Sequence, residues 1–354
     1  MATLFDPLVV GELILPNRIV MAPLTRCRAP GAGNLPNAMM AEYDSQRASA
    51  GLIITEGVPV DPMGVGFADL PGIWTAEQVA GWRAITDAVH NDGGRIFMRL
   101  WHVGRLSDPI FLHGRLPIAP SPIPPIGTVT MVRPKQPWVV PRAATSDDIH
   151  AVIAAFRRGA ENAQQAGFDG VEIHGANGYL LDQFLEDGSN HRTDAFGGST
   201  ENRARLLLEV TDAVVSVWGA GRVGVHLSPR ADGHSMGDSN PRELFGYVAG
   251  ALGRRSIAFL LGREAQREDS LGPTLKKRFG GVYIANERFT LECAKAITAA
   301  GDADAVAFGK AFLANPDLPR RFASHAPLNE PHPTTFYSAG PAGYIDYPAL
   351  PAAP

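Results

Sequence analysis

The chain has 354 residues, of which 45% are hydrophobic and 19% charged, so it is long enough to bury a sizeable core and ordinary for a soluble globular protein. Its formal net charge is −4 and it contains no Lys/Arg run, which makes nucleic acid and anionic membranes unexpected partners. The two cysteines form neither a zinc motif nor a disulfide framework, no apolar run approaches the roughly 18 residues of a membrane span, and the start does not resemble a signal peptide, so a cytoplasmic location is expected.

The predicted elements begin with a small hairpin over residues 8–14 that turns at Gly11 and Glu12. Strands and helices then alternate, and Thr75 and Ser146 are expected to cap two of the helices. Strands are predicted at 18–22, 51–56, 95–101, 169–174, 222–227, 256–261, 281–284 and 304–308. Helices are predicted near 37–49, 76–91, 146–166, 201–218, 241–253, 270–278, 290–300 and 310–323.

Eight strand–helix repeats predict an α/β fold, a (β/α)8 TIM barrel, because parallel strands need crossover connections and eight such units can close. We expect one domain over residues 1–354, with the hairpin plugging the amino end of the barrel. Residues 107–145 follow the third strand and contain nine prolines. A loop of this length is often a functional lid, so we expect it to overhang the carboxyl face.

The fourth predicted strand runs into a glycine-rich turn that carries His174, Asn177 and Tyr179. His174 and Asn177 can each present an N–H donor, and the phenol of Tyr179 can release a proton. Two donors and an acid suit an electron-rich oxygen with a proton source beside it. Each residue alone is more often a cap or a core side chain, but the carboxyl ends of barrel strands are where this fold places its chemistry.

Other strand ends carry further candidates. Arg99 lies in an apolar strand, where a buried arginine needs either a nearby carboxylate or a ligand, and both interpretations stay open. His226 in the fifth strand is, by itself, typical of a satisfied core residue. Thr25 follows the first strand, and its hydroxyl can hydrogen-bond a ring carbonyl beside Pro23 and Leu24.

The last two strands lead into the loops that form the recurrent phosphate site of this architecture. Asn286, Gly309 and Lys310 lie there, with Gly309 permitting close backbone approach and Lys310 supplying charge. The sequence lacks zinc-ligand spacing, a nucleophile elbow and a P-loop, and no metal is expected. A Schiff-base lyase would have to use Lys310, the one lysine near a strand end.

These motifs together resemble the Old Yellow Enzyme family of FMN-dependent ene-reductases. The resemblance runs almost end to end and includes Met-Ala-Pro-Leu-Thr-Arg (21–26), Leu-Trp-His-Val-Gly-Arg (100–105), His-Gly-Ala-Asn-Gly-Tyr-Leu-Leu-Asp-Gln-Phe (174–184), Thr-Asp-Ala-Phe-Gly-Gly-Ser-Thr-Glu-Asn-Arg (193–203) and Ala-Phe-Gly-Lys-Ala-Phe-Leu-Ala-Asn-Pro-Asp-Leu (307–318). Such long ungapped runs are highly specific. The branch with a threonine near the flavin is the most similar. Another branch has a cysteine there, to which Cys27, two residues later, is not equivalent.

The resemblance implies a non-covalent FMN, reduced by NADPH or NADH and reoxidised by a small electron-poor alkene such as an enone, maleimide or nitroalkene. His174 and Asn177 would hold the substrate oxygen, flavin N5 would deliver hydride to the β carbon, and Tyr179 would protonate the α carbon. The implied flavin contacts are Pro23, Leu24, Thr25, Gly57, Arg99, His226, Asn286, Gly309 and Lys310, and the implied further substrate contacts are Phe67, Trp101 and Tyr344.

This sequence departs from the family pattern at three positions. Arg99 replaces a glutamine, His226 replaces an arginine that faces the N1–C2 edge of the flavin, and Lys310 replaces a more usual arginine. We therefore expect the cation to have moved between strands, with Arg99 facing that edge and His226 beside it; in the alternative, Arg99 turns to a carboxylate. The altered residues also leave open a low-turnover flavin or ligand-binding protein.

Overall fold

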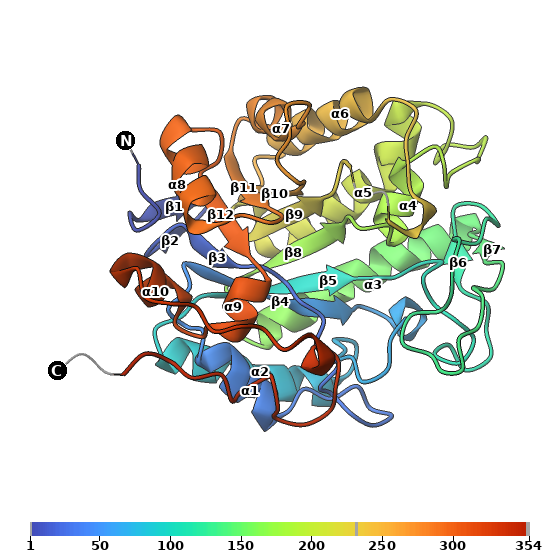
Figure 1. Ribbon diagram of the computed structural model, residues 1–354. Coiled ribbons are helices and arrows are strands. Elements are labelled where there is room, and N and C mark those ends of the chain that lie inside the picture. Colours follow the sequence, from blue (N-terminus) through green and yellow to red (C-terminus); the bar gives the residue numbers. More distant parts are fainter. Residues whose placement is uncertain (1, 231–232, 352–354) are drawn as a thin grey trace.

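The chain closes into an eight-stranded parallel barrel in the computed structural model, which describes residues 2–230 and 233–351 (Figure 1). This confirms the α/β fold class and the (β/α)8 TIM barrel. Each predicted barrel strand is present, with shifted ends. In order around the barrel the strands are β3 (Ile19–Met21), β4 (Leu52–Pro59), β5 (Ile96–Trp101), β8 (Gly170–Gly175), β9 (Val223–Leu227), β10 (Phe259–Arg263), β11 (Val282–Asn286) and β12 (Ala305–Phe308), and β12 pairs with β3.

Helices surround the barrel on its outer side (Figure 1). The α-helices are α1 (Ala38–Ser45), α2 (Ala76–Asn91), α3 (Ser146–Gln165), α4 (Leu180–Leu185), α5 (Thr200–Trp218), α6 (Pro241–Arg254), α7 (Gly272–Phe279), α8 (Leu291–Ala300), α9 (Lys310–Ala314) and α10 (Leu318–Ser324). Single 3₁₀ turns occur at Pro62–Gly64, Ala220–Arg222, Gly233–Ser235 and Pro333–Thr335. None of the helices in the described ranges is long and apolar enough to cross a membrane.

One helix is missing from the predictions, and two predictions need correction. Helix α4 is not signalled by the sequence pattern, because it is short and entirely buried. The helix predicted near 310–323 is two helices, since Asn315 precedes Pro316 and adopts an extended conformation with φ −131° and ψ 91°. Thr75 caps α2 as expected, whereas α3 is capped by Thr145 rather than by Ser146.

The N-terminal hairpin closes the amino end of the barrel. Its strands β1 (Leu8–Val10) and β2 (Leu13–Leu15) pair antiparallel, and Val10 and Leu15 share a buried cluster with inward-facing residues of the barrel strands. The backbone N–H of Glu12 also donates to the carbonyl of Gly221, just before β9. The hairpin therefore packs against the amino end of the barrel, opposite the strand ends that carry the predicted site.

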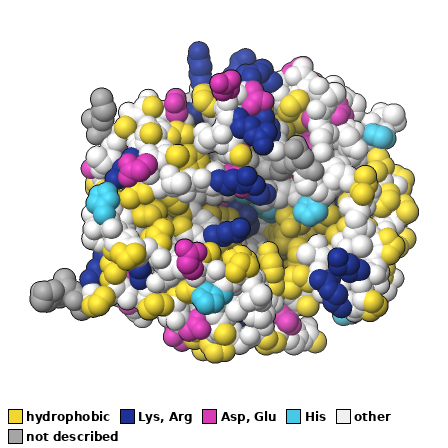
Figure 2. All heavy atoms as spheres, in the orientation of Figure 1, with side chains coloured by type: hydrophobic (Ala, Val, Ile, Leu, Met, Phe, Trp, Pro, Cys, Tyr) yellow, Lys and Arg dark blue, Asp and Glu magenta, His cyan; other side chains and the backbone are white. Residues whose placement is uncertain are grey.

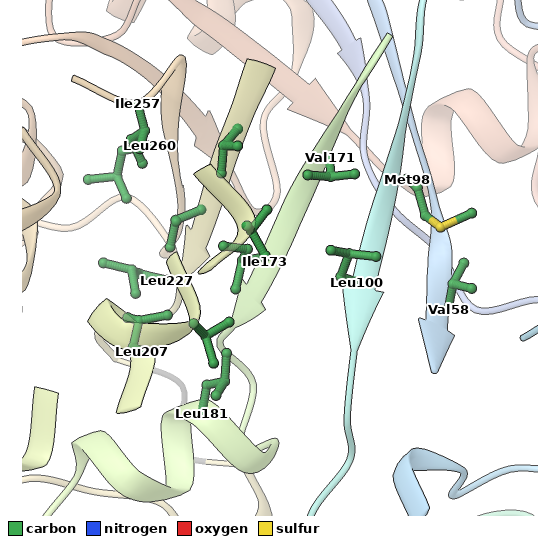
Figure 3. Packing of buried hydrophobic residues seen from close by; sticks show 14 of the residues in the cluster. Val58, Met98, Leu100, Val171, Ile173, Leu181, Leu207, Leu227, Ile257 and Leu260 are labelled. Carbon is green, nitrogen blue, oxygen red and sulfur yellow. The ribbon is translucent and has the colours of Figure 1, made fainter. Parts of the chain in front are cut away.

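Alternation along the strands separates an outer shell from the barrel interior. Met98, Leu100, Val171 and Ile173 lie in the shell with helix residues (Figure 3). Phe97 is the interior neighbour of Met98 on β5, and it fills the interior near the amino end, with the ring of Phe259 at a centroid distance of 5.8 Å. Further toward the carboxyl end, the interior positions of β5, β8 and β9 change from apolar to polar residues.

The proline-rich excursion is closed at its base. Strands β6 (Ile118–Ala119) and β7 (Arg142–Ala143) pair in parallel, so these two parts of the excursion lie together. The buried Arg105, just after β5, donates from Nη1 to the carbonyl of Ile123 and from Nη2 to the carbonyls of His234 and Ser235. The excursion is thus tied to the loop that follows β9, and its role as a lid stays a prediction.

Two glycines provide a matched test of interior packing. A Cβ at Gly224 on β9 would lie 2.2 Å from the ring of Phe259, whereas a Cβ at Gly246 on α6 meets nothing within 4 Å. We expect Gly224→Ala to destabilise the fold by about 1–3 kcal/mol through overpacking, and Gly246→Ala to stabilise it by about 0.5–1 kcal/mol. Urea unfolding of both variants measures the two effects. Equal midpoints would contradict the close approach of Phe259.

Candidate active site

The turn after β8 brings His174 and Tyr179 together. Asn177 and Gly178 both adopt positive φ, 59° and 77°, a region that asparagine and glycine tolerate better than most residues. The backbone N–H of Asn177 donates to Ser228 Oγ at 2.6 Å, which fixes the turn against the end of β9. As a result, the rings of His174 and Tyr179 have centroids 5.2 Å apart.

Trp101, the last residue of β5, completes an aromatic wall beside this turn. Its ring meets Tyr179 edge-on at a centroid distance of 4.7 Å, and Phe67 stacks on Trp101 at 5.7 Å. Gly57 on β4 makes room for this arrangement, since a Cβ there would lie 2.3 Å from the Trp101 ring. Four of the predicted contacts, at positions 67, 101, 174 and 179, therefore lie together.

Arg99 lies in the barrel interior and pairs with Glu172, its neighbour in register on β8. Arg99 Nε lies 2.6 Å from Glu172 Oε2 and Arg99 Nη2 lies 3.2 Å from Oε1, a two-pronged contact between side chains that are almost fully buried. Nη2 also lies 2.5 Å from Nδ1 of His226. The expectation that His226 sits beside Arg99 is confirmed, and the alternative partner, a carboxylate, is present as well.

The charge of Arg99 and burial fix the protonation of the neighbouring rings. Burial, reinforced by Arg99, holds the pKa of His174 and of His226 well below its ordinary value. Burial raises the pKa of Tyr179, and the nearby Tyr337 adds to this rise. Near neutral pH both imidazoles are therefore uncharged and the phenol keeps its proton.

Arg263, a residue that the sequence pattern does not single out, orients Asn177. Its Nη1 donates to Asn177 Oδ1 at 2.7 Å, and its Nε pairs with Glu287 at 2.7 Å. With the carbonyl oxygen engaged in this way, the amide NH2 of Asn177 remains for a ligand. The sequence predicts that the sixth strand ends at 261, but the strand runs to Arg263. The charged residues Arg263 and Glu264, which directly follow the apolar run, were the signal that could have identified Arg263 as a site residue.

Tyr344 does not lie with the other predicted substrate contacts. Its ring stacks on Tyr43 with centroids 4.1 Å apart, and the side chain is 1% exposed. Arg26 and Arg28 lie over the same ring and donate to carbonyls of the tail between residues 335 and 343. The substrate-contact prediction for Tyr344 is therefore corrected: the residue fastens the C-terminal tail to the loop after β3.

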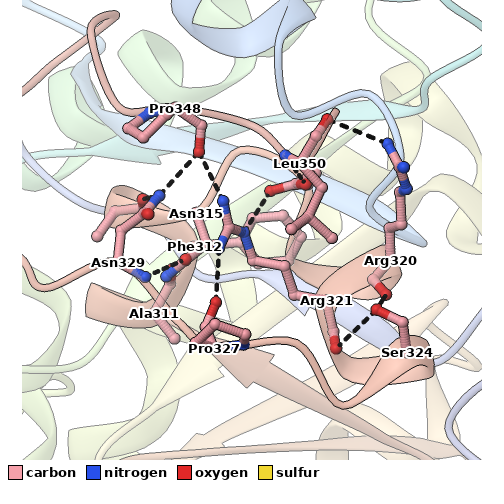
Figure 4. A network of polar contacts seen from close by, with 12 residues as sticks. Ala311, Phe312, Asn315, Arg320, Arg321, Ser324, Pro327, Asn329, Pro348 and Leu350 are labelled. Carbon is pink, nitrogen blue, oxygen red and sulfur yellow. Dashed lines mark hydrogen bonds and ion pairs between the residues drawn. The ribbon is translucent and has the colours of Figure 1, made fainter. Parts of the chain in front are cut away.

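The tail is fastened a second time at α10. Arg321 donates to Asp317 and to the carbonyls of Pro327 and Pro348 (Figure 4). Asn329 reaches the carbonyl of the same Pro348 at 2.9 Å. These bonds hold the tail across α9 and α10, beside the loops after β3 and β12.

The chain matches the family model described as NADH:flavin oxidoreductase / NADH oxidase over residues 3–329. It is 43% identical to a rice (Oryza sativa subsp. japonica) 12-oxophytodienoate reductase 1 over 98% of this chain and 93% of that one. It is also 43% identical to a probable flavin mononucleotide-dependent alkene reductase of Leishmania infantum, over 98% of this chain and 97% of the relative.

The protein belongs to this flavin oxidoreductase family. Solved structures agree: a morphinone reductase in complex with tetrahydroNAD superposes with a TM-score of 0.96 at 44% identity, covering 99% of both chains. The Old Yellow Enzyme homologue from Zymomonas mobilis superposes with a TM-score of 0.96 at 43% identity, covering 99% of this chain and 100% of the other. The chain is thus an FMN-dependent oxidoreductase of the Old Yellow Enzyme family.

Buried ring nitrogens at the barrel mouth bear on the fit of a flavin and its substrate. Buried ring nitrogens of Trp101, His174 and His226 have no hydrogen-bond partner among residues 2–230 and 233–351. Buried polar groups are normally paired, so such a cluster fits an ordered water or a bound ligand. The space-filling view shows a hollow in the middle of the visible face, with basic and histidine side chains in and around it (Figure 2).

The predicted phosphate residues also come together. Asn286 ends β11 and its amide Nδ2 donates to the carbonyl of Ala307 on β12, while Lys310 is exposed at the start of α9. Gly309 directly precedes Lys310, and a Cβ at Gly309 would meet only the side chain of Leu24 within 4 Å. These residues fit a phosphate of FMN, with Lys310 as its cation. Their contacts with the cofactor stay predictions, as do those of Pro23 and Thr25.

Cys27, two residues after Thr25, is not a reactive flavin-side thiol. It is 3% exposed, and burial, followed by the charge of Glu56, raises its pKa to about 12. Cys293 is exposed at the start of α8. The two cysteines of this family member therefore differ sharply in access.

We expect a disulfide reagent at pH 8 to modify one thiol of the native protein, Cys293, because only an accessible thiolate attacks. Both thiols should react after unfolding in urea. The Cys293→Ser variant is the matched control, and we expect its native state not to react with the reagent. Rapid reaction of that variant would show that Cys27 is accessible.

Proposed function

We propose that this chain reduces the carbon–carbon double bond of a small enone, maleimide or nitroalkene, with NADPH or NADH as the electron donor. The observation that carries the proposal is the convergence of His174, Asn177 and Tyr179 at one end of the barrel, with ring nitrogens left unpaired beside them. The expected cytoplasmic setting belongs to the same proposal, and the low cysteine content supports it.

The two donor residues would bind the substrate oxygen. His174 is neutral and retains one N–H, and Arg263 orients the amide of Asn177 by donating to its carbonyl oxygen, so that its NH2 can serve the substrate. Donors that are already oriented stabilise negative charge as it develops on the oxygen, without reorganising during the reaction. A bound FMN would supply the hydride chemistry that links the nicotinamide to the β carbon of the alkene.

Tyr179 would supply the proton that completes the reduction at the α carbon. Its raised pKa keeps the phenol protonated, and the edge-on contact with Trp101 fixes the ring. No lysine in the described ranges takes a comparable position: Lys310 is exposed at the start of α9 rather than inside the barrel, so the lysine-dependent lyase has no structural support.

The direct test uses the purified protein under nitrogen. We expect visible absorbance from bound oxidised FMN, and NADPH or NADH oxidation that depends on 2-cyclohexenone or N-methylmaleimide. Cyclohexanone is the matched control, because it offers the same oxygen without the double bond. A flavin that is reduced by the nicotinamide but is not reoxidised by any activated alkene would favour the low-turnover flavin-binding alternative.

The role of Tyr179 is separable by half-reaction. We expect Tyr179→Phe to slow alkene reduction by about 10²–10⁴-fold, because the phenol is the proton donor, while flavin reduction by NADPH stays near normal. Stopped-flow absorbance measures each half-reaction. Tyr247→Phe on α6, far along the chain from the turn after β8, is the control and should change neither. An equal loss in both half-reactions for Tyr179→Phe would indicate a structural role only.

A further inference from the structure

Three buried side chains form a line across neighbouring strands of the barrel interior. Glu172 on β8 accepts two bonds from Arg99 on β5, and Arg99 Nη2 reaches Nδ1 of His226 on β9 at 2.5 Å. Their exposed fractions are 0%, 5% and 2%. The carboxylate of Glu172 balances the charge of the Arg99 guanidinium, and the remaining contact of that guanidinium is with an imidazole.

The chemistry of the guanidinium decides the state of that imidazole. Arginine has five N–H donors and no acceptor. Nδ1 of His226 must therefore accept the bond from Nη2, which requires an unprotonated Nδ1. A neutral imidazole with a bare Nδ1 carries its single proton on Nε2. The contact with Arg99 thus selects both the charge and the tautomer of His226.

The proton on Nε2 is left without a partner. Nε2 of His226 is buried and makes no hydrogen bond to any residue in 2–230 or 233–351. The His174 ring lies nearby, with a centroid distance of 5.2 Å, and it also holds a buried, unpaired nitrogen. A buried donor of this kind is normally paired, so its acceptor is either an ordered water or a ligand.

We propose that His226 donates a neutral hydrogen bond from Nε2 to a carbonyl oxygen or ring nitrogen of the FMN ring, and that Arg99 is a positioning residue that selects the required tautomer. The proposal rests on the proposed function, because it takes FMN to occupy the barrel mouth. The pyrimidine part of the flavin ring is rich in acceptors and gains electron density when the flavin is reduced. A fixed donor there stabilises the reduced form.

The surrounding charges support a neutral His226. Burial is the largest cause of its lowered pKa, and Arg99, His174 and Arg263 lower that pKa further. The carboxylate that faces this group, Glu172, is engaged by Arg99. We therefore expect the ring to resist protonation well below neutral pH rather than to act as a cation.

The tautomer can be read directly by NMR of the apoprotein with ¹⁵N-labelled histidine, with the His226 signals assigned by their loss in His226→Gln. We expect an unprotonated Nδ1 and a protonated Nε2 from pH 8 to pH 5, and a shift of the Nε2–H resonance when FMN is added. A proton on Nδ1, or a charged ring at neutral pH, would overturn the role of Arg99. An Nε2–H resonance that FMN leaves unmoved would overturn the donor role.

The effect on the flavin is measured by its midpoint potential. His226→Phe keeps a ring but removes the donor and should lower the potential, whereas His226→Gln keeps an N–H and should stay closer to wild type. His150→Gln, on the exposed face of α3, is the control. If His226→Phe binds FMN and its flavin has the same midpoint potential as in the wild-type protein, the donor role of His226 is wrong. That result would not contradict the proposed alkene reduction.

The proposed function and the role of His226 can fail separately. If wild-type protein binds FMN and reduces an enone but shows the opposite tautomer, only the inference about His226 is wrong. If the wild-type protein binds no FMN at any concentration, the proposed function fails and the donor role falls with it. The apoprotein spectrum would then still decide whether Arg99 sets the tautomer, because that measurement needs no flavin.

Discussion

The ion pair between Arg99 and Glu172 is the constraint on which the arrangement of the barrel mouth depends. Two charges removed from water are costly unless each is paired with good geometry, and here the guanidinium meets the carboxylate through two nitrogens. The pair lies between an apolar layer around Phe97 and Phe259 and the open end of the barrel. Breaking one partner would leave a buried charge at the base of the site.

This pairing also contributes to the neutral state of the imidazoles at the mouth. Burial is the main cause of the lowered pKa of His174 and of His226, the guanidinium of Arg99 lowers each pKa further, and the carboxylate of Glu172 pairs with that guanidinium. The orientation of two side chains at the mouth is set by arginines behind them. Arg99 contacts His226, and Arg263 donates to Asn177. Arginines from two strands thus position the two side chains that we propose to face the ligand.

Much of this arrangement follows from the sequence, because strand ends in a parallel barrel converge on one face. His174, Asn177, Tyr179 and Trp101 meet for that reason. The sequence does not predict contacts that depend on strand register or on segments far apart in the chain. Glu172 shares a face with His174 by simple alternation, yet only the β5–β8 register shows that it opposes Arg99. Tyr344 belongs to a tail whose attachment to Arg26 and Arg28 no local pattern reveals.

Neutral donors suit a reaction in which negative charge appears on the substrate oxygen only in passing. A permanent cation beside that oxygen would bind an anion strongly before and after the reaction, whereas N–H groups gain most when the charge develops. The proton-donor role that we propose for Tyr179 follows the same logic, since its raised pKa keeps the phenol protonated near neutral pH. Burial and the charge of Arg99 together therefore keep the neighbouring imidazoles neutral, and the carboxylate of Glu172 pairs with that charge.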